Sequence, residues 1–187
     1  MATIKVLVLA TNGQKQELVI DVASLNYTKT LTADQSSSSV TLAKVTNLDI
    51  VAVPVGVYTF KYMIRYQSAV TTTGARFSVN FSGTTPWFNA LIMWADVGSA
   101  SSSGAVDQDQ VLTTGAVVGV FASRTKSALG WGTTISVDTA NADVLAIIEG
   151  TFEVSVAGNI ELFHGSEVAG GVSTVKVGSN LILTKVN

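Results

Sequence analysis

The chain has 187 residues, enough for one compact domain with a small appendage, and it carries a formal net charge of -2 with 13% charged residues. A soluble domain usually has about 25% charged residues, and here Ser, Thr, Gly and Asn replace the missing charge. Such a surface repels its own copies weakly, which suits an assembly component. The charge balance gives no long-range attraction to nucleic acid or anionic lipid. The absence of cysteine excludes disulfides and thiolate metal sites.

Membrane segments and a secretory signal are not expected. The most apolar stretches, residues 50–57 and 90–95, are much shorter than the ~20 residues that span a bilayer. The apolar run at the N-terminus is also short, and it ends in Asn12-Gly13, a dipeptide typical of hairpin turns. We therefore expect a strand there.

The first element in chain order is a β-hairpin. A two-residue turn at Asn12-Gly13 would place Val6 opposite Val19 and Leu7 opposite Leu18. An isolated hairpin is marginally stable in water, so it must dock on something. It either joins the main sheet or forms an arm that pairs with a neighbouring subunit.

A polar stretch over residues 28–39 has the composition of a linker. We accordingly expect residues 1–35 to form the hairpin or arm with its linker, and residues 36–187 to form a single domain.

The body reads as many short strands separated by turns. Tyr58, Phe60, Tyr62, Ile64 and Tyr66 alternate with polar or smaller residues, which predicts a long strand with one aromatic face. No segment has a sustained helical period. The pattern predicts an all-β fold, either a β-sandwich or a barrel. The strands are expected over residues 57–66, 77–81, 87–95, 111–122, 133–137, 144–156, 160–163 and 181–186.

The strands of residues 143–186 are apolar on both faces, so both faces must be covered. A three-residue loop at 157–159 would make a hairpin in which Val154 pairs with Leu162 and Phe152 with His164. That register assigns these residues to the core. It leaves Phe163 and one face of residues 181–186 to be covered by the opposing sheet or a neighbouring subunit.

Catalytic and metal sites have little support in the sequence. His164 is the only histidine, so a nucleophilic triad or an imidazole metal site would need it. Its register position favours a buried structural role. A calcium site formed by Asp107, Asp109 and possibly Asp96 lacks the glycine and distal glutamate of an EF-hand, which favours a solvated acidic loop. We expect no catalytic residue, no metal and no cofactor.

Aromatic side chains offer one further kind of site. Trp87, Trp94 and Trp131 could stack on sugar rings, although aromatics on strands are more often core or interface residues. No phosphate-binding loop or basic stripe is present, so we expect no nucleic-acid partner.

Three segments of the chain resemble structural proteins of tailed bacteriophages. They are residues 56–80 (GVYTFKYMIRYQSAVTTTGARFSVN), 149–162 (EGTFEVSVAGNIEL) and 173–183 (STVKVGSNLIL). The proteins that they resemble are jelly-roll domains of head-decoration (cement) proteins and of tail or fibre modules. The resemblance implies a jelly-roll β-sandwich and a trimer on the virion, and it brings no catalytic motif.

The leading hypothesis from the sequence is a homotrimeric decoration protein on the capsid surface that bridges major capsid subunits. The alternatives are a tail or fibre-tip module that binds a host receptor, a carbohydrate-binding β-sandwich, and a hydrolase acting through His164 and Ser166. The candidate assembly interface consists of aliphatic and aromatic strand residues: Ile4, Val6, Val8, Val19, Phe163 and Ile182.

Overall fold

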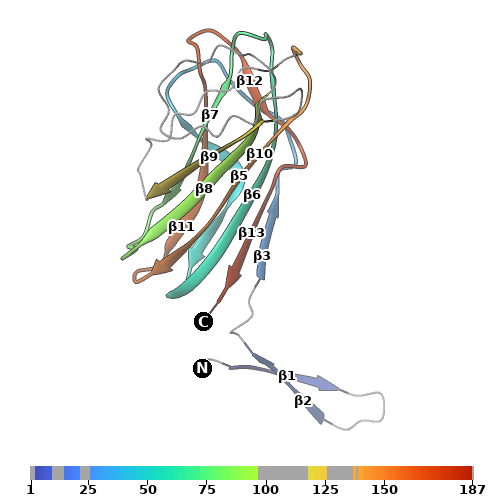
Figure 1. Cartoon of the computed structure of the whole chain (residues 1–187). Coiled ribbons are helices and arrows are strands. Elements are labelled where there is room, and N and C mark those ends of the chain that lie inside the picture. Colours follow the sequence, from blue (N-terminus) through green and yellow to red (C-terminus); the bar gives the residue numbers. More distant parts are fainter. Residues whose placement is uncertain are drawn as a thin grey trace.

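The computed structural model describes residues 3–9, 15–21, 26–96, 118–125, 137 and 139–186. All regular secondary structure within these residues is β-strand (Figure 1). The strands are β1 (Thr3–Leu9), β2 (Lys15–Asp21), β3 (Asn26–Thr30), β4 (Gln35–Ser37), β5 (Ala43–Val53), β6 (Gly56–Ser68), β7 (Ala75–Phe81), β8 (Phe88–Asp96), β9 (Val118–Thr125), β10 (Val144–Val154), β11 (Gly158–Ser166), β12 (Ser173–Val175) and β13 (Asn180–Lys185).

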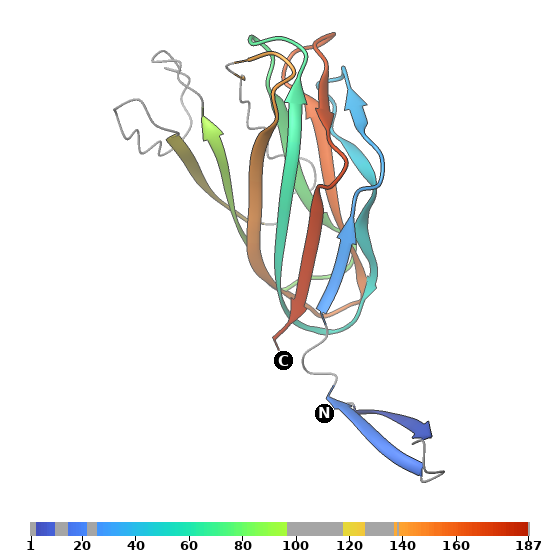
Figure 2. The ribbon, with the colours of Figure 1, turned by 90° about the vertical axis from the view of Figure 1, so that its right-hand side faces the viewer.

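The body of the molecule is a β-sandwich of two antiparallel sheets. The larger sheet has the order β3-β13-β6-β10-β8-β9, and the short strands β12 and β4 extend it beside one end of β6. The smaller sheet has the order β5-β11-β7. Figures 1 and 2 show these two layers with the N-terminal hairpin below them. The predicted all-β sandwich is confirmed, while the jelly-roll topology stays a prediction.

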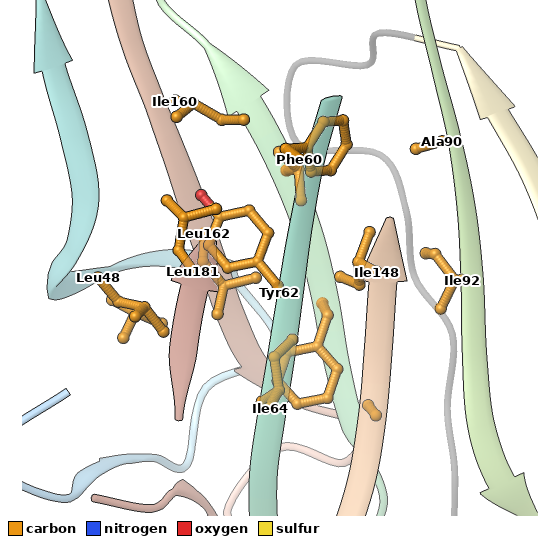
Figure 3. Close-up of a cluster of buried hydrophobic side chains, with 14 of the residues drawn as sticks. Leu48, Phe60, Tyr62, Ile64, Ala90, Ile92, Ile148, Ile160, Leu162 and Leu181 are labelled. Carbon is orange, nitrogen blue, oxygen red and sulfur yellow. The ribbon is translucent and has the colours of Figure 1, made fainter. Parts of the chain in front are cut away.

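Strand β6 forms the middle of the larger sheet because it pairs with β13 on one side and β10 on the other. Its predicted alternation is confirmed, since Tyr58, Phe60, Tyr62, Ile64 and Tyr66 are all buried. Figure 3 shows Phe60, Tyr62 and Ile64 of this set among aliphatic residues from both layers. The alternating residues of β6 lie on the outer face of the sandwich.

Phe152 of β10 connects the aromatic residues of the two sheets. Its ring centroid lies 5.7 Å from that of Tyr58, 5.8 Å from Phe60 and 5.4 Å from Phe88, all in the larger sheet. It also lies 5.2 Å from the ring of Phe81 in the smaller sheet. Stacked, tilted and edge-on pairs at these separations add to the stabilisation from burial.

The N-terminal hairpin exists, but its predicted register is wrong by one residue. Val6 pairs with Leu18, and Lys5 pairs with Val19. A shift of one residue exchanges the two faces of a strand. The observed register aligns Ile4 with Ile20, whereas the predicted one would have set Ile4 against Asp21. The observed register therefore gathers more aliphatic residues on one face of the hairpin than the register of a two-residue turn would.

The predicted hairpin between β10 and β11 does not form. Strand β10 pairs with β6 and β8, and β11 pairs with β5 and β7, so the chain crosses from one sheet to the other between them. Phe152, Leu162 and His164 are nevertheless buried, because β10 and β11 turn these side chains into the space between the two sheets. The assignment of these residues to the core was correct, and their pairing was not.

The stretch with linker composition contributes to the body. Strand β3 pairs with β13, β4 pairs with β12, and Leu31 between them is buried in the core. Strand β3 and Leu31 precede residue 36, where the body was expected to begin, and β4 includes that residue. A truncation that spares the sandwich must therefore end before Asn26.

Replacing Phe152 with alanine should destabilise the protein by about 3–5 kcal/mol, because it removes a ring that packs against both sheets and leaves a cavity. Urea unfolding followed by circular dichroism measures the loss. The exposed Val51 of β5 provides a control, and Val51→Ala should change stability by less than ~0.5 kcal/mol. Equal effects of the two substitutions would contradict the role given to Phe152.

Candidate assembly surfaces

The hairpin of β1 and β2 forms a sheet of its own, and within the described residues these strands pair only with each other. Ile4, Val6 and Val8 occupy alternate positions of β1 and therefore one face. Val19 pairs with Lys5 and belongs to the other face. Of the four hairpin residues predicted to form an interface, the register brings three together and separates the fourth.

Phe163 and Ile182 lie on opposite outer faces of the sandwich. Phe163 is half-buried in the smaller sheet, where it pairs with Lys44 and Ser78. Ile182 lies in the larger sheet and is 36% exposed. Their neighbours Leu162 and Leu181 point into the shared core. One flat partner surface therefore cannot cover both residues of the same copy.

The outer face of the larger sheet has an apolar row that the sequence prediction did not identify. Met63 of β6, Ile147 of β10 and Met93 of β8 are paired side by side and are half-buried. Leu145 stands next to this row and is 48% exposed. The alternation of apolar residues along each strand places each of the three on the outer face. Only the order of the strands in the sheet brings them side by side.

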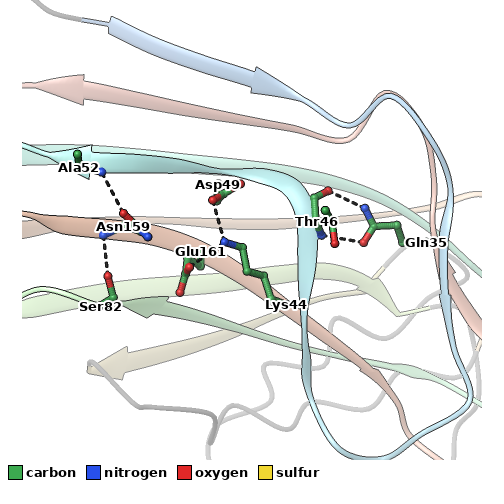
Figure 4. A network of polar contacts seen from close by, with 8 residues as sticks. All are labelled: Gln35, Lys44, Thr46, Asp49, Ala52, Ser82, Asn159 and Glu161. Atoms are coloured by element: carbon green, nitrogen blue, oxygen red, sulfur yellow. Dashed lines mark hydrogen bonds and ion pairs between the residues drawn. The ribbon is translucent and has the colours of Figure 1, made fainter.

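The outer face of the smaller sheet is occupied by a polar network (Figure 4). Lys44 Nζ lies 2.8 Å from Asp49 Oδ2 and 2.9 Å from Glu161 Oε1. The hydrogen bonds to Asp49 and Glu161 raise the pKa of the Lys44 ammonium. Asn159 accepts a bond from the Ala52 N–H and donates its own backbone N–H to the Ser82 hydroxyl. These contacts link the three strands of the smaller sheet.

His164 is a buried structural residue. Its side chain stacks on Phe77 with ring centroids 5.5 Å apart, and its Nε2 lies 2.8 Å from Ser173 Oγ. The Ser173 hydroxyl donates in turn to the Gly165 carbonyl at 3.3 Å. Burial lowers the pKa of the imidazole to about 4. A neutral ring that donates from Nε2 satisfies this chain of hydrogen bonds.

Ser166, the other residue named for a hydrolase, forms no hydrogen bond with His164. Ser166 is fully buried, and its hydroxyl has no hydrogen-bond partner within the described residues. Glu167 accepts a bond from the Gly74 N–H at 2.8 Å.

Several of the remaining candidate residues cannot be placed. Asp107, Asp109 and Trp131 lie outside the described residues, and only the backbone of Trp94 and Asp96 is described. Within the described residues, no group of three or more histidine, aspartate or glutamate side chains could hold a metal ion. The same part of the chain contains no helix that is long and apolar enough to cross a membrane.

Comparisons with known proteins identify no family. No family model matches the chain, and no curated protein matches it. A solved structure of infectious bursal disease virus, Gx strain, aligns with 97% of this chain at 12% identity and a TM-score of 0.21. The aligned part spans 43% of that viral chain. An alignment at this TM-score carries no argument about fold or function.

The buried imidazole predicts a loss of stability in mild acid. Between pH 6.5 and pH 4 the unfolded histidine is protonated while the folded one stays neutral, so the unfolded state binds more protons. The free energy of unfolding should therefore fall as the pH decreases through this window, by on the order of 3 kcal/mol in total.

The substitution His164→Gln isolates this effect, because the carboxylates titrate in both proteins. Urea unfolding of the wild type and the variant at pH 7, 5.5 and 4.5 should show a steeper decrease for the wild type. Parallel pH dependences, or an imidazole NMR titration near the ordinary histidine value, would contradict the burial.

Proposed function

We propose that this chain is a structural protein of a virion, of the decoration type. In this proposal the sandwich sits on the capsid surface as a homotrimer and bridges neighbouring major capsid subunits. The hairpin of β1 and β2 is the anchoring arm.

The hairpin is the observation that carries the proposal. A two-stranded hairpin is marginally stable alone, and this one pairs with no other described strand of its own chain. Its register places aliphatic residues opposite one another at Ile4–Ile20 and Val6–Leu18. A partner that buries this face would supply the stabilisation that the isolated hairpin lacks.

The phage-like segments support a virion role for the body. Residues 56–80, 149–162 and 173–183 include the whole of β6, β12 and most of β7, and large parts of β10, β11 and β13. They therefore contribute to both layers of the sandwich. Self-association is favoured by the low charge and by the apolar row of Met63, Ile147 and Met93.

Deleting residues 1–21 tests the arm, because the truncation ends before β3. The full chain should elute as a trimer in gel filtration with light scattering, and it should co-sediment with capsids assembled from the major capsid protein of the source genome. The truncated protein should keep its β-sheet circular dichroism and lose co-sedimentation. Retained binding would remove the hairpin from the mechanism, and a monomer that binds no capsid would overturn the proposal.

A matched pair of variants identifies the face of the hairpin that binds. The triple variant Ile4→Ser, Val6→Ser, Val8→Ser removes aliphatic side chains from one face and should abolish co-sedimentation. Leu7→Ser with Val19→Ser alters the other face. The dissociation constant of this variant for capsids should rise by less than ~10-fold, a loss of binding free energy below about 1.4 kcal/mol. The reverse order would assign binding to the other face.

A further inference from the structure

A shallow groove crosses the outer face of the larger sheet at the end opposite the apolar row. Two open hollows meet over Gly150 of β10. One is lined by residues of β13, β6 and β10, and the other by residues of β10 and β8. Their outward-facing residues are Thr184, Thr59, Thr151, Asn89, Ile182, Lys61, Glu149 and Leu91.

Strand register aligns four small polar side chains across this groove. Thr59 pairs with Thr184 on one side and with Thr151 on the other, and Thr151 pairs with Asn89. The side chains of these four residues make no hydrogen bond within the described residues, so their donors and acceptors are open to a ligand. Four adjacent strands span about 14 Å, enough for a chain of a few sugar rings.

An ion pair lies beside the polar row. Lys61 Nζ is 3.1 Å from Glu149 Oε2, and both side chains are partly exposed. Each charged group retains further capacity, because an ammonium donates three hydrogen bonds and a carboxylate accepts about four. The opposite charges cancel, so the groove offers charge-assisted hydrogen bonds without selecting an ionic ligand.

Trp87 supplies an exposed aromatic side chain on the same sheet face, beyond the groove-lining Asn89. The Glu153 N–H donates to the Trp87 carbonyl at 3.2 Å, which extends the pairing of β10 with β8 by one residue. Phe88 points into the core, and Trp87 is 37% exposed on the outer side, two residues before Asn89. Indole faces pack against the apolar face of a pyranose ring while nearby polar groups bind its hydroxyls.

Gly150 lies under the groove, where β10 and β8 approach each other closely. A Cβ at this position would lie 2.1 Å from the Asn89 carbonyl oxygen and 2.9 Å from the Ala90 Cα. These contacts involve backbone atoms, which cannot move aside as a flexible side chain would. Only glycine fits where β10 and β8 approach each other. Its position alternates with the outward-facing Glu149 and Thr151, so it belongs to the core face of β10.

From these observations we infer that the groove binds a neutral oligosaccharide, with Trp87 stacking on one ring and the Thr59–Thr151–Asn89 row and the Lys61–Glu149 pair binding hydroxyls. This site is independent of the hairpin, so it does not depend on the decoration role.

The full chain should be tested on an array of immobilised neutral oligosaccharides, followed by calorimetric titration of the strongest binder. Trp87→Ala should weaken that binding by about 10-fold or more. Thr151→Val keeps the shape of the side chain and removes its hydroxyl, and it should also weaken binding. Leu145→Ala is the control, because Leu145 is exposed on the same face beside the apolar row.

Circular dichroism and urea midpoints should show that all three variants remain folded. The inference is overturned if no neutral oligosaccharide binds at millimolar concentration, or if binding is unchanged in both Trp87→Ala and Thr151→Val. It is also overturned if Leu145→Ala weakens binding as much as Trp87→Ala. In that last case a second copy covering the whole face would be the better explanation, and light scattering would show it as a change of mass.

Discussion

The packing of Phe152 against aromatic rings of both sheets is the contact on which the rest of the structure depends. It joins Tyr58, Phe60 and Phe88 of the larger sheet to Phe81 of the smaller one. Because side chains alternate along a strand, burying one set of positions commits the other set to the outside. The residues that are buried in this core therefore determine which residues form the outer surfaces that partners can reach.

Those outer surfaces differ in chemistry. The smaller sheet presents the Lys44–Asp49–Glu161 network, whose groups already bind one another. The larger sheet changes along its strands, from the hydroxyl row at Thr59 and Thr151 to the apolar row at Met63 and Ile147. An apolar row suits contact with protein, and a row of open hydroxyls and amides suits a hydrated ligand. One sheet face can therefore serve two kinds of partner at its two ends.

Local sequence signals predicted where individual strands lie better than they predicted which strands are adjacent in a sheet. The alternation of Tyr58 to Tyr66 predicted both β6 and its buried face correctly. The loop signal at residues 157–159 predicted a hairpin, although the chain there changes sheets. A Cβ on Gly158 would lie 2.1 Å from the backbone nitrogen of Gly83, a close approach between segments far apart in sequence. No local pattern reports such a contact, and the same turn residues serve a hairpin or a crossover equally well.

The sequence by itself determined the fold class, the aromatic core face and the low charge, because composition and strand periodicity are properties of the chain alone. Tertiary structure decided which strands are adjacent, and with them the hairpin register, the separation of Phe163 from Ile182, and the groove over Gly150. These features arise from neighbours on adjacent strands. Some of these neighbours lie more than a hundred residues apart in the sequence, as Thr59 and Thr184 do. Side-chain alternation tells which face a residue takes, but only the order of strands tells which residues share that face with it.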